Sequence, residues 1–210
     1  MKERSPIVFI VDDDEAVRSS LRLLLKSVGL VPSPFGSASD FLDAYDPEQP
    51  GCLVLDVRMP QMSGLELQEE LNRRGAVLPV IFITGHGDVP MAVEAMQAGA
   101  FDFLQKPFRD QDLIDRIQRA LKKDDDIRTA LDKRGLIGER FDSLTPRERE
   151  VLDLMSQGRS NKQMAFELGV SQRTIEIHRG RVMEKTGAAS LAQLVRMVMD
   201  LGQTTPPAAG

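Results

Sequence analysis

The 210-residue chain has 41% hydrophobic and 28% charged residues, a composition typical of a globular protein with one large or two small domains. Its single cysteine, Cys52, excludes a disulfide scaffold and a cysteine-based zinc finger, and no apolar run has the length of a membrane span. The net charge of −5 argues against nucleic acid as a ligand of the chain as a whole, but the acidic excess lies in residues 1–123, whereas residues 141–210 are nearly neutral. With no signal peptide visible, we expect a cytoplasmic protein that does not contact membranes.

Residues 1–123 alternate short apolar runs with amphipathic stretches. Four runs are interpreted as buried strands: Ile7–Val11, Cys52–Leu55, Val80–Ile83 and Phe101–Leu104. Val31–Phe35 is a weaker strand, because its prolines suit only the edge of a sheet. Helical spacing links Val17 to Val28, and again Leu113 to Leu121. This alternation predicts a parallel sheet covered by helices on both faces.

Residues 124–140 are rich in charge and begin with three consecutive aspartates. Ile127 and Leu131 keep a helical spacing, so we expect a solvent-exposed helical linker with a break near Gly135 and Gly138. A coiled coil has little support, because Asp124 interrupts the apolar seam.

Residues 141–203 show no strand pattern, and signals for helix starts recur instead. The capping boxes are Thr145 to Glu148, with a proline at the first helical position, Ser160 to Gln163 and Ser190 to Gln193. The pattern of residues 160–187 predicts a helix, a turn at Gly169 and a second helix capped by Ser171. The segment predicts a small all-α domain, followed by a disordered tail at residues 204–210.

Polar side chains follow four of the predicted strands: Asp12, Asp13 and Asp14, then Asp56, then Thr84, then Lys106. In an open parallel sheet these strand ends share one edge, where ligands bind. A single aspartate there is as readily a turn former or a helix cap. Together, however, the carboxylates suit Mg²⁺, and the lysine and hydroxyl suit phosphoryl transfer onto a carboxylate.

The second helix of the helix-turn-helix segment has two distinct faces. Ile175, Val182 and Thr186 share one face, and the opposite face carries Arg173, Ile177, Gly180, Arg181 and Glu184. Charged residues on a helix most often form only a solvated face. Ile177 favours DNA instead, because an outward apolar side chain can touch a thymine methyl group, and Arg173 can reach guanine.

Residues 5–123 resemble a two-component receiver domain, through Val8–Asp14, Leu55–Pro60 with Gly64, Thr84-Gly85-His86 and Lys106-Pro107-Phe108. The resemblance implies a flavodoxin-like (CheY-like) fold with five strands in the order 2-1-3-4-5, and a sensor histidine kinase that phosphorylates Asp56. It implies Mg²⁺ held by Asp12, Asp13, Asp56 and the backbone carbonyl of Arg58. It further implies phosphoryl contacts from Thr84 and Lys106, an aromatic switch at Phe103, and a dimer helix with Met91, Val93 and Met96. His86 and Arg58, two residues past Thr84 and Asp56, are placed to screen the phosphoryl group from water, with a solvated loop residue as the alternative for His86.

Residues 141–202 resemble the LuxR/NarL-type helix-turn-helix, through Leu144–Leu152, Ser160–Ala165 and Thr174–Arg179. The whole chain therefore resembles FixJ-type response regulators, which are transcription factors rather than enzymes. The resemblance implies a four-helix domain, a homodimer on phosphorylation, binding to promoter DNA, and RNA polymerase as a candidate partner. The implied phosphate contacts are Asn161, Lys162, Thr174, His178 and Lys185, and the base-edge candidates are Arg173, Glu176, Ile177 and Arg179, with Arg181 also facing outward.

We therefore expect an α/β receiver at residues 1–123, a helical linker at 124–140 and an all-α DNA-binding domain at 141–203. Two alternatives stay open. One is a phosphatase of the haloacid-dehalogenase type, since Asp12–Ala16 approaches its Asp-x-Asp-x-Thr/Val pattern but ends in alanine. The other is a DNA-binding protein that acts without phosphorylation.

Overall fold

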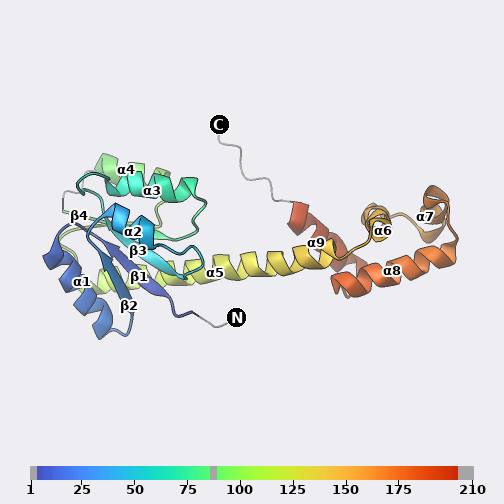
Figure 1. The fold of residues 1–210 in the computed structure, drawn as a ribbon, viewed down its shortest axis with the longest axis horizontal. Coiled ribbons are helices and arrows are strands. Elements are labelled where there is room, and N and C mark those ends of the chain that lie inside the picture. Colours follow the sequence, from blue (N-terminus) through green and yellow to red (C-terminus); the bar gives the residue numbers. More distant parts are fainter. Residues whose placement is uncertain (1–3, 86–88, 203–210) are drawn as a thin grey trace. The chain divides into compact units, whose positions relative to one another are not determined.

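The structure is a computed structural model that describes residues 4–85 and 89–202. It consists of two compact units, Met1–Arg128 and Thr129–Gly210 (Figure 1). Each unit has a hydrophobic core of its own. Among the described residues, no helix combines the length and the hydrophobicity needed to cross a lipid bilayer.

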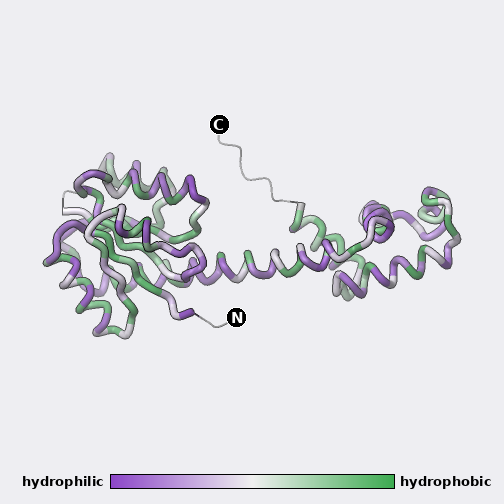
Figure 2. Tube along the Cα trace, viewed as in Figure 1, coloured by the Kyte–Doolittle hydropathy of each residue, from purple (hydrophilic) through white to green (hydrophobic). Residues whose placement is uncertain are grey.

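The first unit is built on a parallel five-stranded sheet in the order β2-β1-β3-β4-β5. The strands are β1 (Ile7–Val11), β2 (Val31–Phe35), β3 (Gly51–Asp56), β4 (Val80–Thr84) and β5 (Asp102–Gln105). This confirms the predicted sheet and its order, and β2 with its two prolines lies at an edge. Strands β3 and β4 are buried along their whole length and are strongly hydrophobic (Figure 2).

Helices cover both faces of the sheet. Helices α1 (Glu15–Ser27) and α5 (Asp110–Asp142) pack on one face, where Leu25 and Ile117 meet the strands. Helices α2 (Ala38–Ala44), α3 (Gly64–Arg73) and α4 (Val89–Gln97) pack on the other face. The predicted amphipathic stretches are therefore core-facing helices, and the carboxyl ends of the strands are left free to form a site.

Helix α5 differs from the linker predicted by the sequence in two respects. It runs from Asp110 to Asp142 without the expected break near Gly135 and Gly138. Asp124, expected in a solvated charge run, is only 1% exposed. The reason is its helical spacing from Ile117 and Ala120, which places Asp124 on the same sheet-facing side of α5.

The second unit contains α6 (Pro146–Ser156), α7 (Asn161–Leu168), α8 (Gln172–Thr186) and α9 (Leu191–Gly202), and the described part of it has no strand. The capping boxes predicted before α6 and α7 are both present, and Gly169 ends α7 with a left-handed φ of 64°. Before α9 the predicted box is half formed: the Ser190 hydroxyl accepts from the backbone N–H of Gln193, while the Gln193 side chain accepts from the backbone N–H of Ala189 rather than from that of Ser190. Leu152, Met164, Ile175, Val182 and Leu194 lie in the common core.

Candidate functional site: an acidic rim and a recognition helix

Asp56 lies at the last position of β3, where the fully buried strand reaches the edge of the sheet. Asp56 is 8% exposed. One carboxylate oxygen, Oδ2, accepts a hydrogen bond of 2.8 Å from the backbone N–H of Arg58. The other, Oδ1, accepts one of 3.1 Å from Nζ of Lys106. The carboxylate is therefore held at the rim of the sheet, with both oxygens in defined directions.

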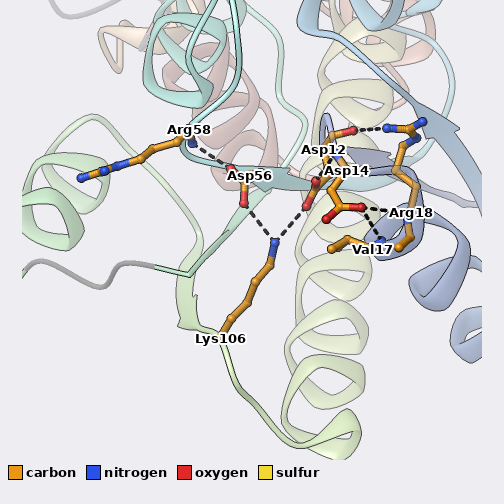
Figure 3. A network of polar contacts seen from close by, with 8 residues as sticks. Asp12, Asp14, Val17, Arg18, Asp56, Arg58 and Lys106 are labelled. Atoms are coloured by element: carbon orange, nitrogen blue, oxygen red, sulfur yellow. Dashed lines mark hydrogen bonds and ion pairs between the residues drawn. The ribbon is translucent and has the colours of Figure 1, made fainter.

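Lys106 joins Asp56 to Asp12, which follows β1 (Figure 3). Its Nζ donates to Oδ2 of Asp12 at 2.9 Å, and the Asp12 residue is only 1% exposed. The backbone N–H of Lys106 also donates to the carbonyl of Thr84, which ties the ends of β4 and β5 together. The structure thus brings Asp12, Asp56, Thr84 and Lys106 to one edge, as the strand-end argument predicts.

The remaining residues of the rim have different environments. Asp13 is exposed, and Asp14 caps α1 by accepting from the backbone N–H groups of Ala16 and Val17. The side chain of Arg58 is exposed and points away from Asp56 in Figure 3. Asp14 therefore fills a structural position, so its pairing with Asp12 in sequence gives no support to the phosphatase alternative.

The acidic rim holds more carboxylates than ammonium groups. Burial raises the pKa of Asp56, and the hydrogen bond and charge of Lys106 oppose that shift. Burial alone would lower the pKa of Lys106, but its hydrogen bonds to Asp12 and Asp56 outweigh this effect and raise it. One ammonium group thus faces two buried carboxylates, which leaves an excess of negative charge where water is scarce.

Mg²⁺ fits this set of donors. Within the described ranges, no three Asp, Glu, His or Cys side chains lie close enough to form a metal cage by themselves. Mg²⁺ does not require such a cage, because it commonly takes one or two carboxylates and fills its shell with water and phosphate oxygens. Asp12 and Asp56 already hold a cation between them, in the form of the Lys106 ammonium group.

Phe103 and the α4 face are the predicted parts of the switch. Phe103 in β5 is half-buried and packs against the core on the α4 side. Met91 packs against the same core, whereas Val93 and Met96 are each 48% exposed. His86, the predicted screening residue, lies outside the described residues.

The exposed face of α8 carries the predicted base-reading side chains. Arg173, Glu176 and Arg181 are exposed, and Ile177 is 51% exposed. Ile175 and Val182 on the opposite face are fully buried, so the two faces predicted from helical spacing are confirmed. Lys162 at the start of α7 is exposed as well, while Thr174 and His178 are half-buried.

Two predicted DNA-contacting cations of α8 have partners inside the domain. Arg179 donates from Nη1 to Oδ1 of Asn161 at 2.8 Å. Lys185 donates from Nζ to Oε2 of Glu148 at 2.7 Å, and to the carbonyl of Ser143 at 3.2 Å. These bonds tie α8 to α7 and to the start of α6. In the free protein, Asn161, Arg179 and Lys185 thus help to hold α8 in place.

Sequence reasoning missed two contributors to these sites and one buried carboxylate outside them. Arg18 donates to the backbone carbonyl of Asp12 at 2.7 Å and so holds the rim loop from α1. Glu148, recognised only as a capping residue, is 2% exposed and pairs with Lys185. Asp124 is buried beside Arg128. The spacing of Asp124 from Ile117 and Ala120 would have revealed its buried position, whereas the partners of Arg18 and Glu148 depend on tertiary contacts.

Comparison with known proteins identifies both units. Residues 8–118 match the response regulator receiver domain, and residues 142–198 match the bacterial regulatory proteins of the luxR family. The chain is 50% identical to the transcriptional regulatory protein FixJ of Azorhizobium caulinodans, over 96% of this chain and 95% of that protein. It is also 50% identical to nodulation protein W of Bradyrhizobium diazoefficiens, over 93% of this chain and 86% of that protein.

Solved structures of similar proteins match nearly the whole chain. The response regulator StyR matches with a TM-score of 0.85 at 49% identity, and the match covers 93% of this chain and 98% of StyR. Full-length FixJ from B. japonicum matches with a TM-score of 0.58 at 42% identity, covering 96% of this chain and 100% of that chain. The acidic rim at the carboxyl ends of β1 and β3, followed by a helix-turn-helix unit, agrees with these matches. The chain belongs to the response regulators of two-component systems, in which a receiver domain is joined to a LuxR-type DNA-binding domain.

Proposed function

We propose that the protein is a transcription factor switched by phosphorylation of Asp56 by a partner histidine kinase. The observation that carries the proposal is the Asp56 carboxylate itself. It is nearly buried, it is held by the Arg58 N–H and the Lys106 ammonium group, and it shares that ammonium group with Asp12. A fixed carboxylate beside a cation is a competent nucleophile for a phosphoryl group.

In the proposed reaction a carboxylate oxygen of Asp56 attacks phosphorus, and the bond to the donor's histidine nitrogen breaks with its electron pair on that nitrogen. Lys106 offsets charge on the transferring group, and the Thr84 hydroxyl donates to one of its oxygens. Asp12, Asp13, Asp56 and the Arg58 carbonyl would hold Mg²⁺, which supplies further charge neutralisation when bound. The added charge of about −1.5 to −2 then draws Thr84 inward, and Phe103 follows.

The proposed output is a dimer on promoter DNA. Val93 and Met96 expose apolar surface on α4, and Leu191 and Met199 of α9 are 39% and 60% exposed, so both units offer faces to a second copy. Two copies would place two α8 helices about one turn of DNA apart. We propose base contacts from Arg173, Glu176, Ile177 and Arg181, and phosphate contacts from Lys162, Thr174 and His178. Asn161, Arg179 and Lys185 would contact phosphates through side-chain N–H groups that are not engaged in their internal bonds.

The test is DNA binding by a gel-shift assay, with and without Mg²⁺ and acetyl phosphate, followed by sizing of the phosphorylated protein. We expect phosphorylation to raise DNA affinity and to produce a dimer, and Asp56→Asn to remove both effects. Asp43→Asn is a matched control, because Asp43 is exposed on α2. If Asp56→Asn responds to acetyl phosphate as the parent does, the switch is refuted. If the parent binds equally well without phosphorylation, a phosphorylation-independent regulator is the better description.

A further inference from the structure

A buried charge pair lies at the edge of the receiver opposite to the phosphoacceptor. Asp124 of α5 accepts a hydrogen bond of 2.8 Å from the backbone N–H of Gly51, the first residue of β3. The side chain of Asp124 is 2% exposed and that of Arg128, its ion-pair partner, is 18% exposed. A carboxylate so deeply buried is costly unless it is fully paired, so this contact requires a specific partner set.

Arg128 completes that set. Its Nε donates to both carboxylate oxygens of Asp124 at 2.9 Å. Its Nη1 donates to the carbonyl of Pro47 at 2.9 Å, and its Nη2 to the carbonyl of Gln49 at 3.1 Å. All three guanidinium nitrogens are therefore used. We call Asp124, Arg128, Gly51 and the carbonyls of Pro47 and Gln49 the α5 clamp.

The first residue of β3, which donates to Asp124, is closely packed against β1. A Cβ atom at Gly51 would lie 2.0 Å from the carbonyl oxygen of Ile7, so a larger residue cannot take this position without moving the backbone. Strand β3 runs from Gly51 to Asp56 and is buried throughout. One rigid six-residue strand thus connects the clamp at its first residue with the phosphoacceptor at its last.

Beyond the clamp, α5 loses its tertiary support. Arg128 is the last residue of the first compact unit, and residues 129–136 are all exposed. Gly135 and Gly138 are poor helix formers, and short helices without packing partners are marginal in water. The clamp is therefore the last attachment that holds α5 in helical form on the receiver side of this exposed segment.

We propose that Asp124 and Arg128 are positioning residues that keep α5 helical across residues 129–136 and thereby couple phosphorylation of Asp56 to DNA binding. This inference rests on the proposed function, because coupling requires that phosphorylation alters DNA affinity. Neither side chain touches the acidic rim or α8, so loosening the clamp weakens the coupling while the phosphorylation chemistry and the DNA contacts stay intact.

The experiment compares full-length parent with Arg128→Lys and Asp124→Asn. Lysine keeps the positive charge, but its single nitrogen cannot serve Asp124 and both loop carbonyls together. Arg134→Ala and Asp125→Asn are matched controls, since both residues are exposed on the same helix. Three quantities are measured on each protein: the level of phosphorylation by acetyl phosphate, the ratio of DNA affinities with and without phosphorylation, and hydrogen exchange of the amides of residues 129–136.

We expect both clamp variants to be phosphorylated to the same level as the parent. Hydrogen exchange of the amides of residues 129–136 should be at least about tenfold faster than in the parent. The ratio of DNA affinities with and without phosphorylation should fall by a factor of about five or more. The controls should match the parent in all three. An unchanged affinity ratio in Arg128→Lys overturns the inference, whether or not exchange accelerates, and leaves the proposed function standing. If the parent itself shows no affinity ratio, the proposed function fails and the coupling role fails with it.

Discussion

In the described part of the chain, two lysines pair with carboxylates, and the carboxyl groups at these two sites have pKa values shifted in opposite directions. At the receiver rim, Lys106 is shared by Asp12 and Asp56, and burial raises the pKa of Asp56. In the DNA-binding unit, hydrogen bonds from Lys185 and the Thr145 backbone lower the pKa of Glu148 to about 2. One lysine for two carboxylates leaves a site ready for a further cation. One lysine for one carboxylate gives a structural joint.

The largest effect is expected at the structural joint. Glu148→Ala removes the partner of Lys185 and one half of the capping box, so it should lower the unfolding free energy of the DNA-binding unit by about 2–3 kcal/mol. Chemical denaturation of the full chain measures this. Glu150→Ala is the control, because Glu150 is half-exposed in its pair with Arg147 and should cost at most about 0.5 kcal/mol. Equal losses of unfolding free energy in the two variants would mean that the Glu148–Lys185 pair contributes no more than a surface ion pair.

At the receiver rim the expected effect is on chemistry. Asp12→Asn should lower the rate of phosphorylation by acetyl phosphate about 10- to 100-fold and raise the Mg²⁺ concentration that it needs, because one cation-holding carboxylate is lost. Asp14→Asn is the control, since asparagine caps a helix as well as aspartate. A titration of phosphoprotein formation against Mg²⁺ distinguishes the two. Similar rates for Asp12→Asn and parent would remove Asp12 from the site.

The pH dependence of stability should follow Glu148. Its pKa is lowered from 4.5 to about 2 in the folded state, so the unfolded chain binds the proton first as the pH falls. The contribution of the ionised Glu148 to the unfolding free energy is complete above about pH 4.5 and is lost as the pH falls toward 2. We expect the DNA-binding unit to lose about 1–2 kcal/mol over this window, and Glu148→Gln to flatten the curve. A steep curve retained by Glu148→Gln would assign the acid sensitivity to other groups.

The smallest expected effect is a gain in stability rather than a loss. Because the folded state raises the pKa of Asp56, its ionised form destabilises the receiver as the pH rises above the ordinary range of a carboxyl group. Asp56→Asn should therefore stabilise the receiver by about 1 kcal/mol at neutral pH, as is common when a functional charge is removed. Thermal unfolding at pH 7 measures the gain, and a loss of stability would contradict the view of the rim as a strained charge cluster.

The positions of three residues of the acidic rim could be predicted from the sequence. These residues follow apolar runs directly, so strand-end position alone places Asp12, Asp56 and Lys106 at one edge. The buried and exposed faces of α8 were also predictable, because Ile175 and Val182 repeat with helical spacing. The linker was not. A run of three aspartates indicates solvent exposure, although the spacing of Asp124 from Ile117 and Ala120 places it on the buried side of α5. Its pairing with Arg128 also follows helical spacing, whereas its contact with Gly51 depends on the tertiary structure alone.

The sequence by itself determined most of the strands and helices and the chemistry at the edge of the sheet, because these depend on hydrophobic period, helix caps and motifs of a few adjacent residues. The order of the strands followed from the resemblance to receiver domains. Only the tertiary structure decided which charges are solvated and which are buried joints. Asp124 finds its partner 73 positions away in Gly51, and Lys185 finds Glu148 37 positions away. Whether a charged group is buried and paired depends on residues far away in the sequence. The same aspartate or lysine is therefore a solvated surface charge in one fold and a buried ion pair in another.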